Sequence, residues 1–121
     1  MRDDLSRAPS PWDDAVNAYV STLKLERGLS VHSSEGYQRD LDQLAVFLAR
    51  SRLAADWKRV SSAHLSAWIQ QLSGDDLAAT SIARKLSALR GFFKHLVRER
   101  LLLEDPTEGL TTPKLMRRLP G

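Results

Sequence analysis

The sequence contains no cysteine, which excludes a disulfide framework and a thiolate metal site and is typical of a cytosolic protein. It also lacks any apolar run long enough to span a bilayer. The N-terminal stretch MRDDLSRAPS has no hydrophobic core of the kind found in a signal peptide. We therefore expect a soluble protein located in the cytoplasm.

Recognisable metal-binding and phosphate-binding motifs are also missing. His32, His64 and His95 are far apart and show no ligand spacing. No glycine-rich phosphate loop is present. The acid pairs Asp13-Asp14 and Asp75-Asp76 lie near predicted helix starts, where the helix dipole favours acids, so capping is a better interpretation than acid–base catalysis. We expect no metal, no cofactor and no small-molecule ligand.

Positive charge is unevenly distributed along the 121 residues, a length that suits one domain with a modest core. Residues 1–80 hold 9 Lys and Arg against 11 Asp and Glu, a balance of −2. Residues 81–121 hold 9 against 4, a balance of +5. Basic residues concentrated in one part of a chain are typical of nucleic-acid binding.

The apolar residues recur with helical periodicity, and no segment shows a convincing strand pattern. Ser10, Ser30 and Ser61 are predicted N-caps, and Gly28 is a predicted helix stop. Trp57 is expected to fill the core. The pattern predicts helices over about 11–27, 31–50, 61–72 and 78–100, with a short final turn at 107–110. We expect an all-α bundle of four to five helices over 10–111, a flexible N-terminus over 1–9 and an extended basic linker over 112–121.

The predicted fourth helix is the most informative segment. Its apolar stripe comprises Ile82, Leu86, Leu89, Phe93 and Leu96. Its opposite face carries small, polar and basic residues, and no acid occurs before Glu99. Such a face can approach a polyanion closely, although a solvated basic face on a core helix is the simpler alternative. The members of this face are Thr80, Arg84, Ser87, Ala88, Gly91, Lys94 and Arg98.

Seven short segments, taken in their order along the chain, resemble the N-terminal core-binding domain of tyrosine recombinases, in particular the bacterial Xer group. The resemblance covers about residues 12–120. Trp57 and the sequence of Ser81–Leu89 are more similar to the XerC branch than to the XerD branch. The segments are LERGLS at 25–30, YQRDL at 37–41, SIARKLSALR at 81–90, FF at 92–93, DP at 105–106, PK at 113–114 and RRLP at 117–120.

The resemblance implies an integrase-type SAM-like fold, an orthogonal helical bundle that forms half of a clamp around one recombination half-site. The second and fourth helices are then expected to cross the major groove of double-stranded DNA. Arg84 is the strongest candidate, because its fork can bind a guanine edge or bridge phosphates. Arg90 and Lys94 are either backbone contacts or cations that are solvated or paired with an acid such as Glu99. The remaining candidates are His32, Ser33, Gly36 and Arg39 on the second helix, and Thr80, Ser81, Lys85 and Ser87 on the fourth.

Two departures from the family pattern bear on this site. Gly36 stands where the family usually has alanine, which lowers the stability of the helix by about 1 kcal/mol. The glycine is expected either to allow close approach of the helix to a DNA groove or to be neutral. Ala78 stands where the family often has a capping serine, so Asp76 or Thr80 is expected to cap the fourth helix.

Catalysis is not expected of this chain itself. The family cleaves DNA with a tyrosine in a second domain, through a 3′-phosphotyrosyl bond. The two tyrosines here, Tyr19 and Tyr37, lie on apolar helix faces. We expect a fragment or truncated product that binds one half of a dif-like site, and whose full-length parent resolves chromosome dimers in a tetrameric synapse with a sister, XerD-like recombinase. The alternatives are a phage or integron integrase domain, and a helical module whose basic helix docks an acidic protein.

Overall fold

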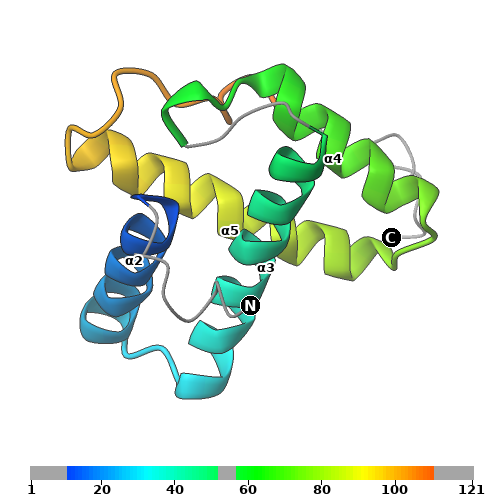
Figure 1. Ribbon diagram of the computed structural model, residues 1–121. Coiled ribbons are helices and arrows are strands. Elements are labelled where there is room, and N and C mark those ends of the chain that lie inside the picture. The colour runs from blue at the N-terminus through cyan, green and yellow to red at the C-terminus, as the bar shows by residue number, and fades with distance from the viewer. Residues whose placement is uncertain (1–10, 52–56, 111–121) are drawn as a thin grey trace, which may run out of the picture.

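The chain folds into four α-helices and one short 3₁₀ turn in the computed structural model, which describes residues 11–51 and 57–110 (Figure 1). No strand occurs within these ranges, which confirms the predicted all-α fold. The Ser10 cap, the N-terminus at 1–9 and the linker at 112–121 lie outside the described residues. The elements are α2 (Pro11–Arg27), α3 (Val31–Arg50), η1 (Trp57–Arg59), α4 (Ser62–Gly74) and α5 (Ala79–Arg98).

Three of the predicted helix ends are confirmed. Gly28 follows α2 with a φ of +63°, a conformation that glycine adopts without strain. The Ser30 side chain accepts a hydrogen bond from the Ser33 N–H at 3.1 Å and so caps α3. At the start of α4, Ser61 accepts from the His64 N–H at 3.3 Å, while His64 Nδ1 accepts from the Ser61 N–H at 3.2 Å. The two groups therefore cap α4 reciprocally.

The predicted capping of α5 is wrong. Its N-cap position is Ala78, and no side chain makes a cap hydrogen bond there. Asp76 instead belongs to the end of α4, because it has a φ of +61° and its N–H donates to the Ser73 carbonyl at 3.2 Å. Thr80 is exposed within the first turn of α5. The start of α5 is therefore held by packing and by backbone hydrogen bonds within the helix, such as Ile82 N–H to Ala78 carbonyl at 3.0 Å.

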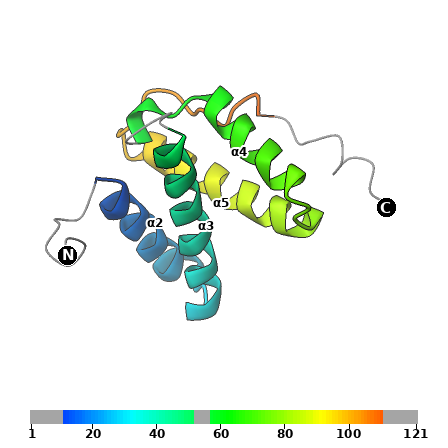
Figure 2. The same cartoon turned by 45° about the vertical axis from the view of Figure 1, so that its right-hand side comes forward.

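The core is built around α5, which every other α-helix contacts (Figures 1 and 2). In these views α2 and α3 lie side by side and α3 crosses α5, while α4 meets α5 at the short connection over 75–78. Trp12 and Tyr19 from α2 pack their rings on Phe92 at centroid distances of 5.5 and 5.8 Å. Trp57 is buried, as predicted. The predicted stripe of α5, namely Ile82, Leu86, Leu89, Phe93 and Leu96, is entirely buried.

The segment after α5 folds back onto the bundle. Ser62 Oγ donates to the Pro106 carbonyl at 2.5 Å, and Arg90 Nη2 donates to the Leu110 carbonyl at 3.0 Å. Thr107 N–H and Oγ1 both donate to Asp105 Oδ1, and Leu110 is buried. The predicted final turn at 107–110 is therefore confirmed and belongs to the bundle. None of the described helices is long and apolar enough to cross a membrane.

Candidate nucleic-acid interface

The open part of the predicted α5 face lies in its first three turns. Thr80, Arg84 and Ser87 are exposed and follow one another at spacings of four and three residues, so they lie along one side of the helix. Ser81 is half-buried beside them. Short hydroxyl side chains on either side of a half-exposed guanidinium leave that group accessible to a large planar or anionic partner.

Two small residues that we expected on this open face are covered. Ala88 is fully buried, and Gly91 packs against the side chain of Tyr19 from α2. A methyl group at Gly91 would lie 3.2 Å from Cζ of Tyr19 and closer still to its hydroxyl oxygen. The small residue at position 91 therefore admits α2. The sequence could not distinguish packing of a neighbouring helix from approach of a ligand.

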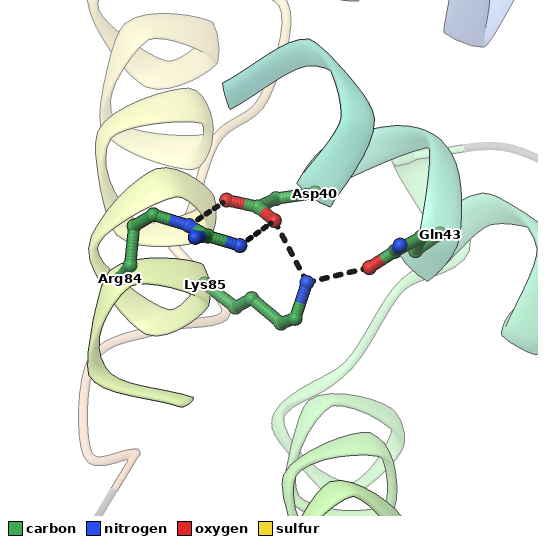
Figure 3. Close-up of polar contacts among 4 residues, drawn as sticks. All are labelled: Asp40, Gln43, Arg84 and Lys85. Carbon is green, nitrogen blue, oxygen red and sulfur yellow. Dashed lines mark hydrogen bonds and ion pairs between the residues drawn. The ribbon is translucent and has the colours of Figure 1, made fainter. Parts of the chain in front are cut away.

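Lys85 points from α5 toward Asp40 and Gln43 of α3 (Figure 3). Its side chain is 7% exposed, and its ammonium group lies 2.8 Å from Oδ1 of Asp40 and 2.6 Å from Oε1 of Gln43, both on α3. The structure thus places this predicted DNA contact between α3 and α5, away from the exposed residues of the face. A buried ammonium needs such partners, because its desolvation is otherwise unfavourable.

Arg84 forms a two-point contact with the same carboxylate. Its Nε donates to Oδ2 of Asp40 at 3.0 Å and its Nη2 donates to Oδ1 at 2.9 Å, while its side chain stays 49% exposed (Figure 3). The hydrogen bonds and the negative charge of Asp40 raise the pKa of the Arg84 guanidinium above its ordinary value. Arg84 therefore remains fully charged and is held at the junction of α3 and α5.

The α3 candidates border the same junction. Ser33, Gly36 and Asp40 succeed one another at spacings of three and four residues on one side of α3, and Asp40 meets Arg84. His32, Ser33 and Arg39 are exposed, and a methyl group at Gly36 would meet no other part of the protein within 4 Å. The Arg84–Asp40 contact thus joins the two predicted groups of residues.

Arg90 and Lys94 lie against the segment that follows α5. Arg90 is half-buried and donates to the Leu110 carbonyl, while Lys94 is 68% exposed with its ammonium 3.9 Å from Oδ2 of Asp105. The sequence suggested Glu99 as an acid partner for these cations, and in the structure the acid near Lys94 is Asp105. Arg90 contributes to the fold through this contact, and Lys94 remains largely accessible.

Sequence reasoning missed Asp40 and Gln43 as parts of the site. Asp40 is 1% exposed although it is ionisable, and it accepts from two cations at once. The available signal was its register, since it follows Tyr37 by three residues and precedes Leu44 by four, among the apolar positions of α3. An acid on the buried side of a helix requires a cation opposite it.

Neither a cluster of metal ligands nor an exposed tyrosine occurs among the described residues. Within 11–51 and 57–110, no group of three or more His, Asp or Glu side chains could hold a metal ion. Tyr19 is buried, and burial raises its pKa above the ordinary value, which disfavours the phenolate. Tyr37 is half-buried on α3. The exposed groups at the junction are suited to binding an anion.

Comparisons with known proteins show the family of the chain. Residues 16–100 match the family described as phage integrase, N-terminal SAM-like domain. The chain is 39% identical over 105 residues to Tyrosine recombinase XerC of Pseudomonas syringae pv. tomato, covering 87% of this chain and 35% of that protein. It is 38% identical over 119 residues to Tyrosine recombinase XerC 1 of Ralstonia nicotianae, covering 98% of this chain and 36% of that protein.

A relative from the other branch is about equally similar. Tyrosine recombinase XerD of Proteus mirabilis is 38% identical over 108 residues, which cover 89% of this chain and 34% of that protein. The chain therefore spans about a third of the length of these curated relatives. No solved structure is significantly similar to it.

Proposed function

We propose that this chain, which belongs to the phage integrase N-terminal SAM-like domain family, is the DNA-binding domain of a XerC-type tyrosine recombinase. In this proposal α3 and α5 clamp one half of a dif-like site on double-stranded DNA. The full-length recombinase would resolve chromosome dimers in the cytoplasm, in a synapse with a XerD-like sister. Strand cleavage would belong to the rest of that protein, since its XerC relatives are more than twice as long as this chain.

One observation supports the binding role above the others. Arg84 is charged, half-exposed and held between α3 and α5, with the hydroxyl side chains of Thr80 and Ser87 on either side of it. Guanidinium groups bind phosphates and guanine edges in two-point contacts, and short hydroxyls bind phosphates without obstructing approach. Gly36 supports the proposal in a second way, because a methyl group there would meet nothing within 4 Å, about one turn before Asp40 on α3.

The charge of the junction also favours DNA. The carboxylate of Asp40 is shared by two cations, so the group of Asp40, Arg84 and Lys85 keeps a net charge of one positive unit. An isolated arginine–aspartate pair would be neutral and would attract a polyanion less. Because Lys85 is buried, the excess positive charge is presented through Arg84.

Fluorescence anisotropy of the 121-residue chain with a dif half-site duplex and a scrambled duplex, each at two salt concentrations, tests the proposal. Tighter binding to the half-site, lost in Arg84→Ala and kept in the matched control Lys24→Ala, is the expected result. Lys24 is exposed at the end of α2, outside the junction. Equal binding to both duplexes would argue against sequence reading by this domain. Failure to bind either at low salt would overturn the proposal and favour an acidic protein partner.

A further inference from the structure

We infer that Asp40 is a positioning residue that fixes the direction in which Arg84 meets the DNA. This inference rests on the function proposed above and assigns a role to a residue that does not touch the ligand. Its basis is the contact in Figure 3, where both oxygens of a buried carboxylate accept from one side of the guanidinium, at 3.0 Å to Nε and 2.9 Å to Nη2. A planar group held at two points has a defined orientation.

The donors left over after this contact define what Arg84 can bind. A guanidinium carries five N–H donors, one on Nε and two on each Nη. Asp40 uses the Nε donor and one donor of Nη2, and no other described residue accepts from Arg84. The two Nη1 donors and the second Nη2 donor therefore remain. Nη1 and Nη2 form the end of the fork, so Arg84 presents this end to a partner.

The end of the fork fits two neighbouring acceptor atoms. The O6 and N7 atoms of guanine in the major groove form such a pair, and so do two oxygens of a phosphate. Without Asp40, a long arginine side chain could also approach with its Nε–Nη2 side or bind as a mobile cation. Asp40 therefore removes alternative binding modes before DNA arrives, and less conformational freedom is lost on binding.

Lys85 makes this arrangement compatible with an anionic ligand. Its ammonium group lies 2.8 Å from Oδ1 of Asp40, so the carboxylate keeps a buried counter-charge while Arg84 turns its remaining donors outward. Gln43 accepts from the same ammonium at 2.6 Å and fixes its position. In this inference Lys85 acts within the protein, in contrast to the direct DNA contact expected from the sequence.

A paired substitution separates positioning from charge. Asp40→Asn together with Lys85→Met removes both buried charges, keeps Arg84 and leaves the net charge of the chain unchanged at +3. Replacing a buried ion pair as a unit is tolerated far better than removing one partner. The matched control is Asp42→Asn together with Lys24→Met, which alters two exposed side chains away from Arg84 by the same chemistry.

The probe is the duplex that the wild-type chain selects most tightly from a randomised pool, resynthesised with single modifications. One set replaces guanine by 7-deazaguanine, which lacks the N7 acceptor, and a second replaces single phosphates by methylphosphonate. One of these modifications is expected to lower the affinity of the wild type about tenfold relative to the unmodified duplex. The same modification should leave the affinity of Arg84→Ala unchanged. If the modification is a 7-deazaguanine, Arg84 binds a guanine edge. If it is a methylphosphonate, Arg84 binds a phosphate. Circular dichroism verifies that each variant is folded.

The decisive comparison is the sensitivity of the paired variant. We expect it to bind unmodified DNA within about threefold of Arg84→Ala and to have lost the tenfold penalty at the same modification, while the control keeps that penalty. A folded paired variant with undiminished sensitivity would overturn the positioning role. If Arg84→Ala keeps the wild-type sensitivity in a chain that still prefers its selected duplex, the inference fails and the proposed function stands. If the wild type binds no duplex, both fail.

Discussion

The ammonium group of Lys85 and the carboxylate of Asp40 are 2.8 Å apart, at 7% and 1% side-chain exposure. This pair connects α5 to α3 inside the bundle, and Gln43 accepts a further hydrogen bond from Lys85. Two charges in such an environment stabilise the fold only in each other's presence, because each one alone is poorly solvated. The pair is therefore as much a part of the packing of α3 on α5 as the apolar side chains around it.

Lys85→Met is expected to destabilise the chain by about 3 kcal/mol, at the lower end of the range for breaking a buried pair because Arg84 still faces Asp40. The free energy of unfolding in urea measures this effect. Lys24→Met, which removes an exposed cation, is expected to change it by less than about 0.5 kcal/mol. Adding Asp40→Asn to Lys85→Met should restore part of the loss. Equal stability of the two lysine variants would contradict the burial of the Lys85 ammonium.

Two glycine-to-alanine substitutions are expected to have opposite effects. Gly91→Ala places a methyl group against the side chain of Tyr19 and should destabilise the chain by about 1–3 kcal/mol. Gly36→Ala meets open space and should stabilise α3 by up to about 1 kcal/mol, since alanine is the better helix former. Thermal unfolding of both variants tests the pair. Tyr19→Phe combined with Gly91→Ala should recover stability, because it removes the hydroxyl that the methyl group meets.

Gly36→Ala also separates stability from binding. If the open space at Gly36 is occupied by DNA in the complex, the stabilised variant should bind its duplex more weakly than the wild type. Anisotropy titrations at fixed salt measure this. Unchanged affinity would mean that α3 does not approach DNA at Gly36 and that its glycine is neutral.

Stability is expected to depend on pH through His95. Its ring is buried beside that of Tyr19, at a centroid distance of 5.4 Å, and no described residue hydrogen-bonds to its Nδ1. Burial lowers the pKa of His95 below the ordinary value of 6.5; Arg98 also lowers it, whereas Glu99 and Glu26 oppose the change. The unfolded chain then binds the proton first as the pH falls.

The sign follows from this order of protonation. The contribution of neutral His95 is fully present above about pH 6.5 and is lost as the pH falls through the pKa of the folded state. Urea unfolding at pH 8 and pH 5.5 should show a larger loss for the wild type than for His95→Gln. His32→Gln, at an exposed position, should behave like the wild type. Identical pH dependence in His95→Gln would show that other groups cause the loss.

Arg90→Met is expected to weaken the packing of residues 107–110 against the bundle. Losing the hydrogen bond from its guanidinium to the Leu110 carbonyl should cost about 1.5 kcal/mol. Hydrogen exchange of the amides around Thr107 and Leu110 should accelerate, whereas Lys94→Met should leave it nearly unchanged. A fall in DNA affinity without faster exchange would instead assign Arg90 to the DNA interface.

The helices were largely predictable from the sequence because their signals are local. Serine caps at 30 and 61, the stop at Gly28 and the apolar stripe of α5 each depend on residues within a few positions of one another. The family assignment made from ordered segments is confirmed by the match over residues 16–100. The capping of α5 was predicted wrongly. Aspartate is a common capping residue, but Asp76 belongs to the turn that ends α4, where it has a positive φ.

The exposure of the candidate interface residues was predictable only where it depends on a single helix. Exposure of Thr80, Arg84 and Ser87 follows from helical periodicity. The fate of Lys85, by contrast, depends on Asp40, which is 45 residues earlier in the chain. Likewise, nothing local to α5 indicates that Tyr19 covers Gly91. Contacts between distant helices determine which polar residues of a basic stripe remain available, and one helix considered alone does not contain that information.

The return of the C-terminal segment brings the last described residue, Leu110, back onto the bundle. Leu110 is buried and its carbonyl accepts from Arg90, so this residue lies beside the middle of α5 and not beyond its end at Arg98. Arg84 and Arg90 are separated along the helix axis by only about 9 Å, at 1.5 Å per residue. The two side chains nevertheless project in directions about 120° apart around α5, Arg84 toward α3 and Arg90 toward the C-terminal turn. One helix therefore holds both the candidate interface and the last turn of the described chain.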